Sequence, residues 1–498
     1  MKINKYVAGL LLLGALGSCK KEFLEKAPAD TINTDNFYQT ADDAIAAVNG
    51  AYQPLQWPKL FNMRMWTTDI MGGNSVVGAG GGTDGIETQD QANFTTLPEN
   101  AGVLDLWRGP FPGILRCNLV LDKVPAIKMD EALKARVLGE ARFLRGHYYF
   151  ILVRFFGDVP LILKPLYPGD DLRPARTAKA DVYQQIIQDL QEAADLLPPR
   201  EQYSGADIGR ASKGAALGML AKVYLTLGDW PKVVAYADRV QALGYALNDT
   251  YGQNFNPLAE NTKESLFEVQ FNKEGEFDFW SNENQASWLS TFTGPRSGDF
   301  VEGGWGWNQP TSEFVSSYEP GDLRKDVTVL YEGGPKFDGR EYKKTYSMTG
   351  YNLRKFLVPK SIATAYNKSP LNFPVLRFSD VLLMKAEALN ELGKGAEAQL
   401  PASDPNATLN KVRARAGLAD VSGLAQGPLR EKILHERRME LAFEGQRWFD
   451  LVRVSGGQYG LNFLHAIGKS NAAPKHLLLP IPQQERDVNP NLTQNEGY

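Results

Sequence analysis

The chain contains few cysteines, few histidines and no long apolar run after its first residues. Beyond the N-terminus, no stretch reaches the 18 consecutive apolar residues that a membrane-spanning helix needs. The four histidines are scattered, and none has a second ligand at metal-binding spacing, so we expect no zinc site. EF-hand spacing is also missing among the carboxylates. The sequence therefore predicts no metal.

Basic tracts and catalytic motifs are missing as well. The formal net charge is −4 and the basic residues are dispersed, which argues against nucleic acid as a partner. No nucleophile elbow, Walker loop or dinucleotide fingerprint occurs in a strand–turn–helix context. We therefore predict a protein that is not an enzyme.

The N-terminus has the pattern of a bacterial lipoprotein signal. Lys2 and Lys5 precede an apolar run over 6–17, and this run ends in LGSC at residues 16–19. We predict that residues 1–18 form the signal peptide and that Cys19 is lipidated, which anchors the chain because each buried methylene contributes about 0.8 kcal/mol. An ordinary secretory signal with a chance cysteine is the alternative. Once Cys19 is lipidated, Cys117 is the only other cysteine, so no intramolecular disulfide can form.

Apolar residues at helical spacing dominate the rest of the chain. The pattern of residues 215–243 predicts two helices joined by a Gly-Asp turn. Small residues would permit these helices to pack closely, as in a tetratricopeptide unit. A second such unit comprises 379–392 and a partner at about 405–416. Further helices are expected at 41–52, 103–156 with a break at Pro125, 181–197 and 430–444. We predict a mainly α fold.

Two segments break the helical pattern. Seven glycines lie between residues 72 and 85, so we predict a long loop within 57–100. Residues 245–375 are rich in Asn, Gly and aromatic residues and contain short alternating runs, such as 265–271. This second segment is predicted to be an irregular insertion with a few short strands.

Three carboxylates, Glu436, Glu440 and Glu444, are spaced four residues apart, which places them on one face of the predicted helix. A carboxylate pair of this kind would suit a glycoside hydrolase. Arginines are interleaved with these residues, so we favour a charge network that fastens the helix to its neighbour.

Several tryptophans lie in the predicted loops. An exposed indole stacks on the apolar face of a sugar, while nearby amides bind its hydroxyl groups, so these residues predict a carbohydrate site. Loop packing is the alternative for each of them. The candidate ligand-binding residues are Trp57, Trp66, Trp280, Trp288, Trp305 and Trp307; the helical Trp107, Trp230 and Trp448 are expected in the core.

A set of ordered motifs resembles the SusD/RagB family of outer-membrane nutrient-binding lipoproteins over nearly the whole chain. The motifs are CKKEFL at 19–24, EARFLRGHYYF at 140–150, FGDVPL at 156–161, GRASKGAA at 209–216, VLRFSDVLLMKAEA at 375–388, ERRMELAFEGQRWFDL at 436–451, LPIP at 479–482 and NPNLTQNEGY at 489–498.

The resemblance implies about four tetratricopeptide-like helix pairs that carry a variable region. The tether would span 19–36 and a single domain 37–498, with the helical scaffold at about 37–244 and 376–498 and the ligand-binding insertion at about 245–375. The segment GGWGW at 303–307 is similar to a stretch common to many members.

The resemblance also implies a function. It predicts a lipoprotein on the outer-membrane surface of a Gram-negative bacterium that captures oligosaccharides. The protein would act as a lid on a SusC-like TonB-dependent transporter. Because the transporter would supply the energy for import, the resemblance implies that this chain needs no cofactor. Two alternatives stay open: a peptide-capturing member of the same family and a surface glycoside hydrolase.

Overall fold

The structure is a computed structural model that describes residues 37–498 except 81, 168, 274–280 and 283–284. Helices predominate over short strands, as predicted for a mainly α fold. The helices are α3 Ala41–Tyr52, α4 Thr68–Met71, α5 Ile86–Asn93, α6 Ala101–Arg108, α7 Pro110–Lys123, α8 Glu131–Phe156, α9 Lys179–Leu196, α10 Lys213–Leu227, α11 Trp230–Gln241, α12 Leu289–Thr293, α13 Ser312–Ser316, α14 Arg324–Thr328, α15 Phe378–Glu391, α16 Gly395–Ala398, α17 Leu409–Arg415, α18 Gln426–Glu440, α19 Arg447–Arg453, α20 Gln458–Ala466 and α21 Gln483–Val488.

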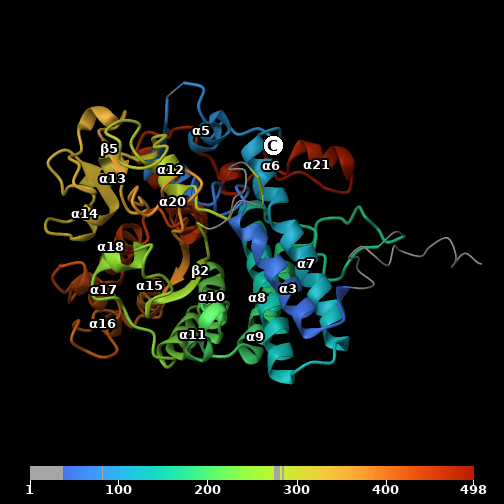
Figure 1. Cartoon of the computed structure of the whole chain (residues 1–498). Coiled ribbons are helices and arrows are strands. Elements are labelled where there is room, and N and C mark those ends of the chain that lie inside the picture. The colour runs from blue at the N-terminus through green and yellow to red at the C-terminus, as the bar shows by residue number, and fades with distance from the viewer. Residues whose placement is uncertain (1–36, 81, 168, 274–280, 283–284) are drawn as a thin grey trace, which may run out of the picture.

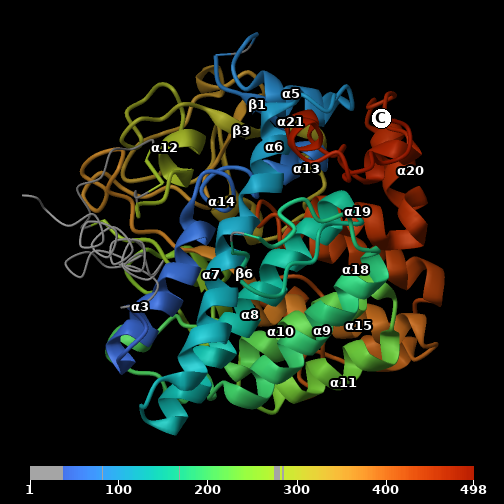
Figure 2. The same ribbon diagram turned by 90° about the vertical axis from the view of Figure 1, so that its right-hand side faces the viewer.

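The long helices pack as successive neighbours. Helices α3, α7 and α8 all contact one another, and α8 to α11 follow one another before α15 and α18 continue the series. Figure 2 shows α7 to α11 as a layer of long rods, and Figure 1 shows the insertion, coloured yellow to orange, beside it. Such stacked helix pairs build a solenoid-like scaffold.

The pair α10–α11 illustrates how local sequence sets this scaffold. The Ser212 hydroxyl accepts a hydrogen bond from the Ala215 N–H at 3.3 Å and begins α10. Gly228, with a φ of 73°, ends α10, and the Asp229 carboxylate caps α11. The predicted pair at 215–243 is therefore confirmed, as are helices at 41–52, within 103–156 and at 181–197.

Six strands form three antiparallel pairs in the described part of the chain. The strands are β1 Ser75–Gly78, β2 Ser265–Val269, β3 Trp307–Pro310, β4 Val329–Tyr331, β5 Tyr351–Leu353 and β6 Phe373–Arg377. Strand β1 pairs with β3, β2 with β6, and β4 with β5. Because β2 pairs with β6, which leads directly into α15, the insertion is joined to the helical scaffold at that point.

Two sequence expectations are corrected. The region 57–100 is not one long loop, since it contains α4, β1 and α5. Helix α18 ends at Glu440, so Glu444 does not share its helix. The chain turns at Phe443 and Gly445, both of which have positive φ, and their N–H groups donate to the buried carboxylate of Asp69.

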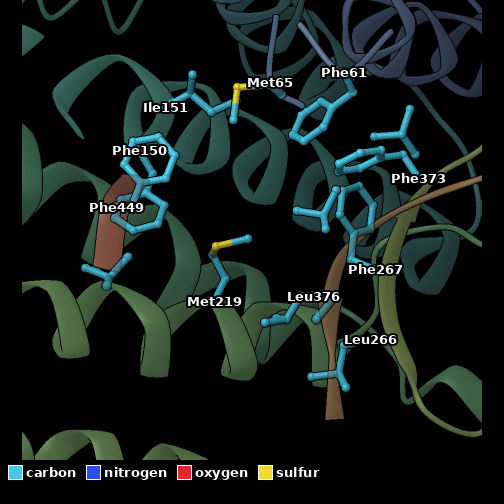
Figure 3. Packing of buried hydrophobic residues seen from close by; sticks show 14 of the residues in the cluster. Phe61, Met65, Phe150, Ile151, Met219, Leu266, Phe267, Phe373, Leu376 and Phe449 are labelled. Atoms are coloured by element: carbon cyan, nitrogen blue, oxygen red, sulfur yellow. The ribbon is translucent and has the colours of Figure 1, made fainter. Parts of the chain in front are cut away.

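One large apolar core links scaffold and insertion. Figure 3 shows Phe150 and Met219 of the scaffold in the same packed layer as Phe267 and Phe373 from β2 and β6. Trp107 and Trp448 are buried in this core, as predicted, while Trp230 packs at its edge. Among the described residues, no helix combines the length and the apolar character needed to cross a membrane.

Candidate functional site

Four of the six candidate tryptophans converge on one residue, Phe292 of α12. The ring centroids of Trp305 and Trp307 lie 4.7 and 5.6 Å from that of Phe292, both edge-on. Trp288 stacks on Phe292 with centroids 5.5 Å apart, and Trp66 lies at 5.9 Å. Edge-on and offset contacts of this kind stabilise an aromatic cluster beyond simple burial.

The four tryptophans have two different roles within this cluster. Trp66 and Trp288 are 0% and 1% exposed, so the prediction that they present open indole faces is wrong. They lie beneath Phe292 and cannot stack on a sugar. Trp305 and Trp307 are partly exposed and form the outer layer. We call Trp305 and Trp307, together with Asp84 and Arg296, the tryptophan surface.

Contacts of the main chain hold Trp305 and Trp307 in place, and Gly85 packs against the Trp307 ring. The backbone N–H of Trp305 donates to the Thr291 carbonyl at 2.9 Å, which attaches the main chain of Trp305 to α12. Trp307 begins β3, where it pairs with Gly78 of β1. A β-carbon at Gly85 would lie 2.3 Å from the Trp307 ring, and Gly85 has a φ of 60°. Glycine is therefore required there on steric and conformational grounds, and the glycine-rich segment packs directly against the indole.

Charged groups border the indoles. The Arg296 Nε donates to the Trp305 carbonyl at 2.8 Å, and its Nη2 pairs with Asp84 at 2.9 Å. Asp84 also accepts from the Gly80 N–H at 2.8 Å. The Thr291 hydroxyl donates to the Tyr366 carbonyl at 3.0 Å, and Tyr366 is 48% exposed. The result is an apolar ring surface beside hydrogen-bond donors and acceptors, which is the combination that a sugar ring requires.

The remaining predicted residues lie elsewhere. Trp57 follows the short 3-10 helix Gln53–Gln56, and the Arg116 guanidinium is 5.6 Å from its ring centroid. Its indole is partly buried and belongs to a different part of the scaffold. Trp280 and the predicted lipidation site Cys19 lie outside the described residues.

The three carboxylates Glu436, Glu440 and Glu444 lie in a charge network, as predicted, but their cations are not the interleaved arginines. Arg437 and Arg438 pair instead with Asp380, Asp450 and Glu313. Glu436, Glu440 and Glu444 are all buried. Glu436 pairs with Arg324 at 2.5 Å and Arg413 at 2.9 Å, while Glu444 pairs with Lys355 at 2.6 Å and Arg377 at 2.7 Å.

Glu440 lies at the centre of this network, in contact with Arg324, Arg377 and Arg415. Burial alone would raise the pKa of Glu440, but these guanidiniums outweigh it and hold the pKa well below its usual range. The carboxylates are fully engaged by cations away from solvent, so the structural interpretation is confirmed.

Comparisons with known proteins agree with this architecture. Residues 263–498 match a model described as "SusD family", and residues 22–225 match one described as "Starch-binding associating with outer membrane". The chain belongs to the SusD family. A SusD-like protein P2 of Formosa agariphila is 29% identical, with both chains covered completely.

Two further relatives of this SusD-family chain have names that state a ligand. The starch-binding protein SusD of Bacteroides thetaiotaomicron is 25% identical over 77% of this chain and 76% of its own. The solved structure of a laminarin-binding SusD-like protein is 29% identical, covers 93% of this chain and 100% of its own, and has a TM-score of 0.77. The tetratricopeptide-like SusD fold expected from the motifs is thus observed.

Sequence reasoning missed three residues of the aromatic site in this SusD-family protein. Phe292 is the residue that all four tryptophans share, yet it is one of 24 phenylalanines and has no distinguishing neighbour pattern. Arg296 and Asp84 form an ion pair across 212 positions of the chain. The only local signal was Gly85, since a glycine-rich segment often permits the backbone to approach a side chain closely.

Proposed function

We propose that this SusD-family protein captures oligosaccharides at the tryptophan surface without cleaving them. The observation that carries the proposal is the pair of partly exposed indoles, Trp305 and Trp307, held edge-on against Phe292. Because their orientation is fixed before a ligand arrives, little side-chain entropy is lost on binding. The starch and laminarin named for the two relatives support a glycan as the ligand.

The charged border supplies the polar half of such a site. Arg296 has two of its nitrogens engaged, by the Trp305 carbonyl and by Asp84, so its orientation is fixed beside the indole. A sugar that stacks on Trp305 can direct its hydroxyl groups toward this guanidinium and carboxylate. Hydrogen bonds to charged groups contribute about 1.5–3 kcal/mol each when well aligned.

The same proposal covers location and partner. The protein would be attached to the outer-membrane surface through lipid on Cys19 and would deliver its ligand to a SusC-like TonB-dependent transporter, over which it closes as a lid. The lipoprotein signal that ends in LGSC at residues 16–19 and the outer-membrane description of the matching family model support this location. Transport energy would come from the transporter, so the capture protein itself would need no cofactor.

Calorimetric titration of the detergent-solubilised full chain with laminari-oligosaccharides, malto-oligosaccharides and a mixed peptide pool tests the proposal. We expect heat of binding for at least one glycan series, and chromatography should recover every sugar at its original length. Shortened products would instead make the protein a glycoside hydrolase. Binding of peptides alone would refute the glycan assignment and favour peptide capture.

A further inference from the structure

A cavity of about 890 Å³ opens where the C-terminal ends of α8 and α10 meet the start of α9, helix α19 and the C-terminal tail. This volume lies in the range typical of small-molecule sites. Its walls combine apolar side chains with four cationic residues. The cationic lining residues are Arg154, Lys179, Arg453 and Lys475, whereas Glu496 is the single acidic one.

Arg154 is the unusual member of this lining. Its guanidinium lies between two phenylalanine rings, 4.0 Å from the centroid of Phe150 and 3.7 Å from that of Phe449. Figure 3 shows both rings on the same side of the core. The Nε donates to the Phe150 carbonyl at 3.1 Å. Within the described part of the chain, the two terminal amino groups have no hydrogen-bond partner, and no carboxylate lies within ion-pair distance.

Arg154 has no ion-pair partner of its own in the described chain, although Asp450 and Asp380 act on it from a greater distance and raise its pKa. In and behind the cavity wall, three cations and three carboxylates are engaged with one another: Lys222 and Arg437 with Asp380, Arg437 and Arg453 with Asp450, and Arg453 with Glu387. Arg154 is the additional cation.

The surroundings of Arg154 raise the free energy of its charged form, because no carboxylate pairs with it closely. Burial lowers its pKa to about 10, so the side chain still carries its positive charge at neutral pH. Arg154 is partly buried. Cation–π contacts offset part of the desolvation cost of such a charge, and an anion would offset more.

We propose that this cavity binds a small organic carboxylate, whose charge pairs with Arg154. The two phenylalanine rings cover both faces of the guanidinium, which leaves only its in-plane edge for a ligand. Planar carboxylates match that edge with two parallel hydrogen bonds. Lys179 and Lys475 at the rim attract the anion, and the apolar surfaces of Leu477 and Leu478 contact its carbon skeleton. The site is independent of the tryptophan surface.

Titration of the full chain with glutarate, glucuronate, sulfate and glucose tests this site. Comparing glutarate with glucuronate shows whether the site prefers a simple organic acid or an acidic sugar. Glucose is the uncharged control for glucuronate. We expect at least one carboxylate to bind, glucose to bind at least tenfold more weakly than glucuronate, and Arg154→Gln to weaken carboxylate binding at least tenfold. Absence of carboxylate binding, preference for sulfate, or unchanged affinity in a folded Arg154→Gln variant would overturn the proposal.

A second pair of variants keeps the test decisive if Arg154→Gln does not fold. Leu227 lines the cavity and is 45% exposed, so Leu227→Glu adds a competing negative charge without disturbing the core. Leu258, 74% exposed, does not line the cavity, and Leu258→Glu is the matched control. We expect Leu227→Glu to weaken carboxylate binding at least threefold and Leu258→Glu to leave it unchanged. Equal affinities in the two variants would contradict the proposed site.

Discussion

Replacing Glu440 by glutamine removes one negative charge from the buried network while nearly preserving side-chain volume. The carboxylate is 0% exposed and contacts three guanidiniums, with oxygen–nitrogen distances of 2.9 Å to Arg377 and 3.3 Å to Arg324. The third contact is with Arg415. In the variant, an amide group would face cations that remain charged and buried. Breaking a buried ion pair by removing one partner costs about 3–5 kcal/mol.

A loss of this size is large relative to the total free energy of unfolding, which is only about 5–15 kcal/mol for folded domains. The free energy of unfolding is measured by urea denaturation, followed by both circular dichroism and tryptophan fluorescence so that coincident transitions verify two-state behaviour. Glu397→Gln on α16 is the matched control, because its only ion-pair contact in the described chain is a 3.6 Å approach to Lys394 and both side chains are more than half exposed.

The two variants should differ clearly. Exposed ion pairs such as the one between Glu397 and Lys394 contribute at most about 1 kcal/mol to the free energy of unfolding. We therefore expect Glu440→Gln to lower the free energy of unfolding by several times the loss in Glu397→Gln. A loss below 1 kcal/mol in both variants would refute the reasoning that the network is a structural element dependent on its central charge.

Other consequences of the structure are equally open to measurement. A β-carbon at Gly113 would lie 2.2 Å from the buried Tyr148 ring, so Gly113→Ala should lower the free energy of unfolding by about 1–3 kcal/mol. Gly427→Ala near the start of α18, where nothing lies within 4 Å but Pro428 follows, should change it by less than about 1 kcal/mol; equal losses in urea denaturation would contradict the packing. The pKa of Glu319 is lowered from 4.5 to about 2, chiefly by hydrogen bonds from an arginine, so its stabilising effect is present above pH 4.5 and lost as the pH falls through 2. The stability difference between the wild type and Glu319→Gln should therefore shrink over that range, and a difference independent of pH would exclude this cause. Cys19→Ala should abolish palmitate labelling and membrane partition in cells, whereas unchanged partition would refute the lipid anchor.

The parts of the fold that were predicted correctly depend on local signals. Helix pair α10–α11 could be identified because Ser212, Gly228 and Asp229 are capping residues at the positions where helices begin and end. That Glu436, Glu440 and Glu444 belong to a charge network could be inferred because arginines are interleaved with them in the sequence, although the cations that pair with them could not be identified. The caps of the helix pair are neighbours in sequence, whereas the cations of the charge network come from segments that are distant in sequence.

The aromatic site depends on contacts that are distant in sequence, so it could be predicted only in part. Composition correctly drew attention to tryptophans in loops, and four of them do meet. Sequence could not tell that Trp66 and Trp288 lie under Phe292 whereas Trp305 and Trp307 lie over it, because burial is decided by how α4, α12 and β3 pack together. The turn at Phe443 was missed for a similar reason, since it is fixed by the carboxylate of Asp69, 374 positions away.

The most direct test of glycan capture compares three tryptophan variants in calorimetric titration with the best-binding oligosaccharide. Trp305→Ala and Trp307→Ala remove the two outer indoles, and Trp230→Ala removes a similarly half-buried indole from α11 as a control. Removal of a central aromatic anchor costs about 2 kcal/mol or more, which corresponds to more than a tenfold loss of affinity. We predict that loss in at least one of the first two variants, with folding retained by circular dichroism, and unchanged affinity in the third. Full affinity in both folded variants of the tryptophan surface would contradict the account.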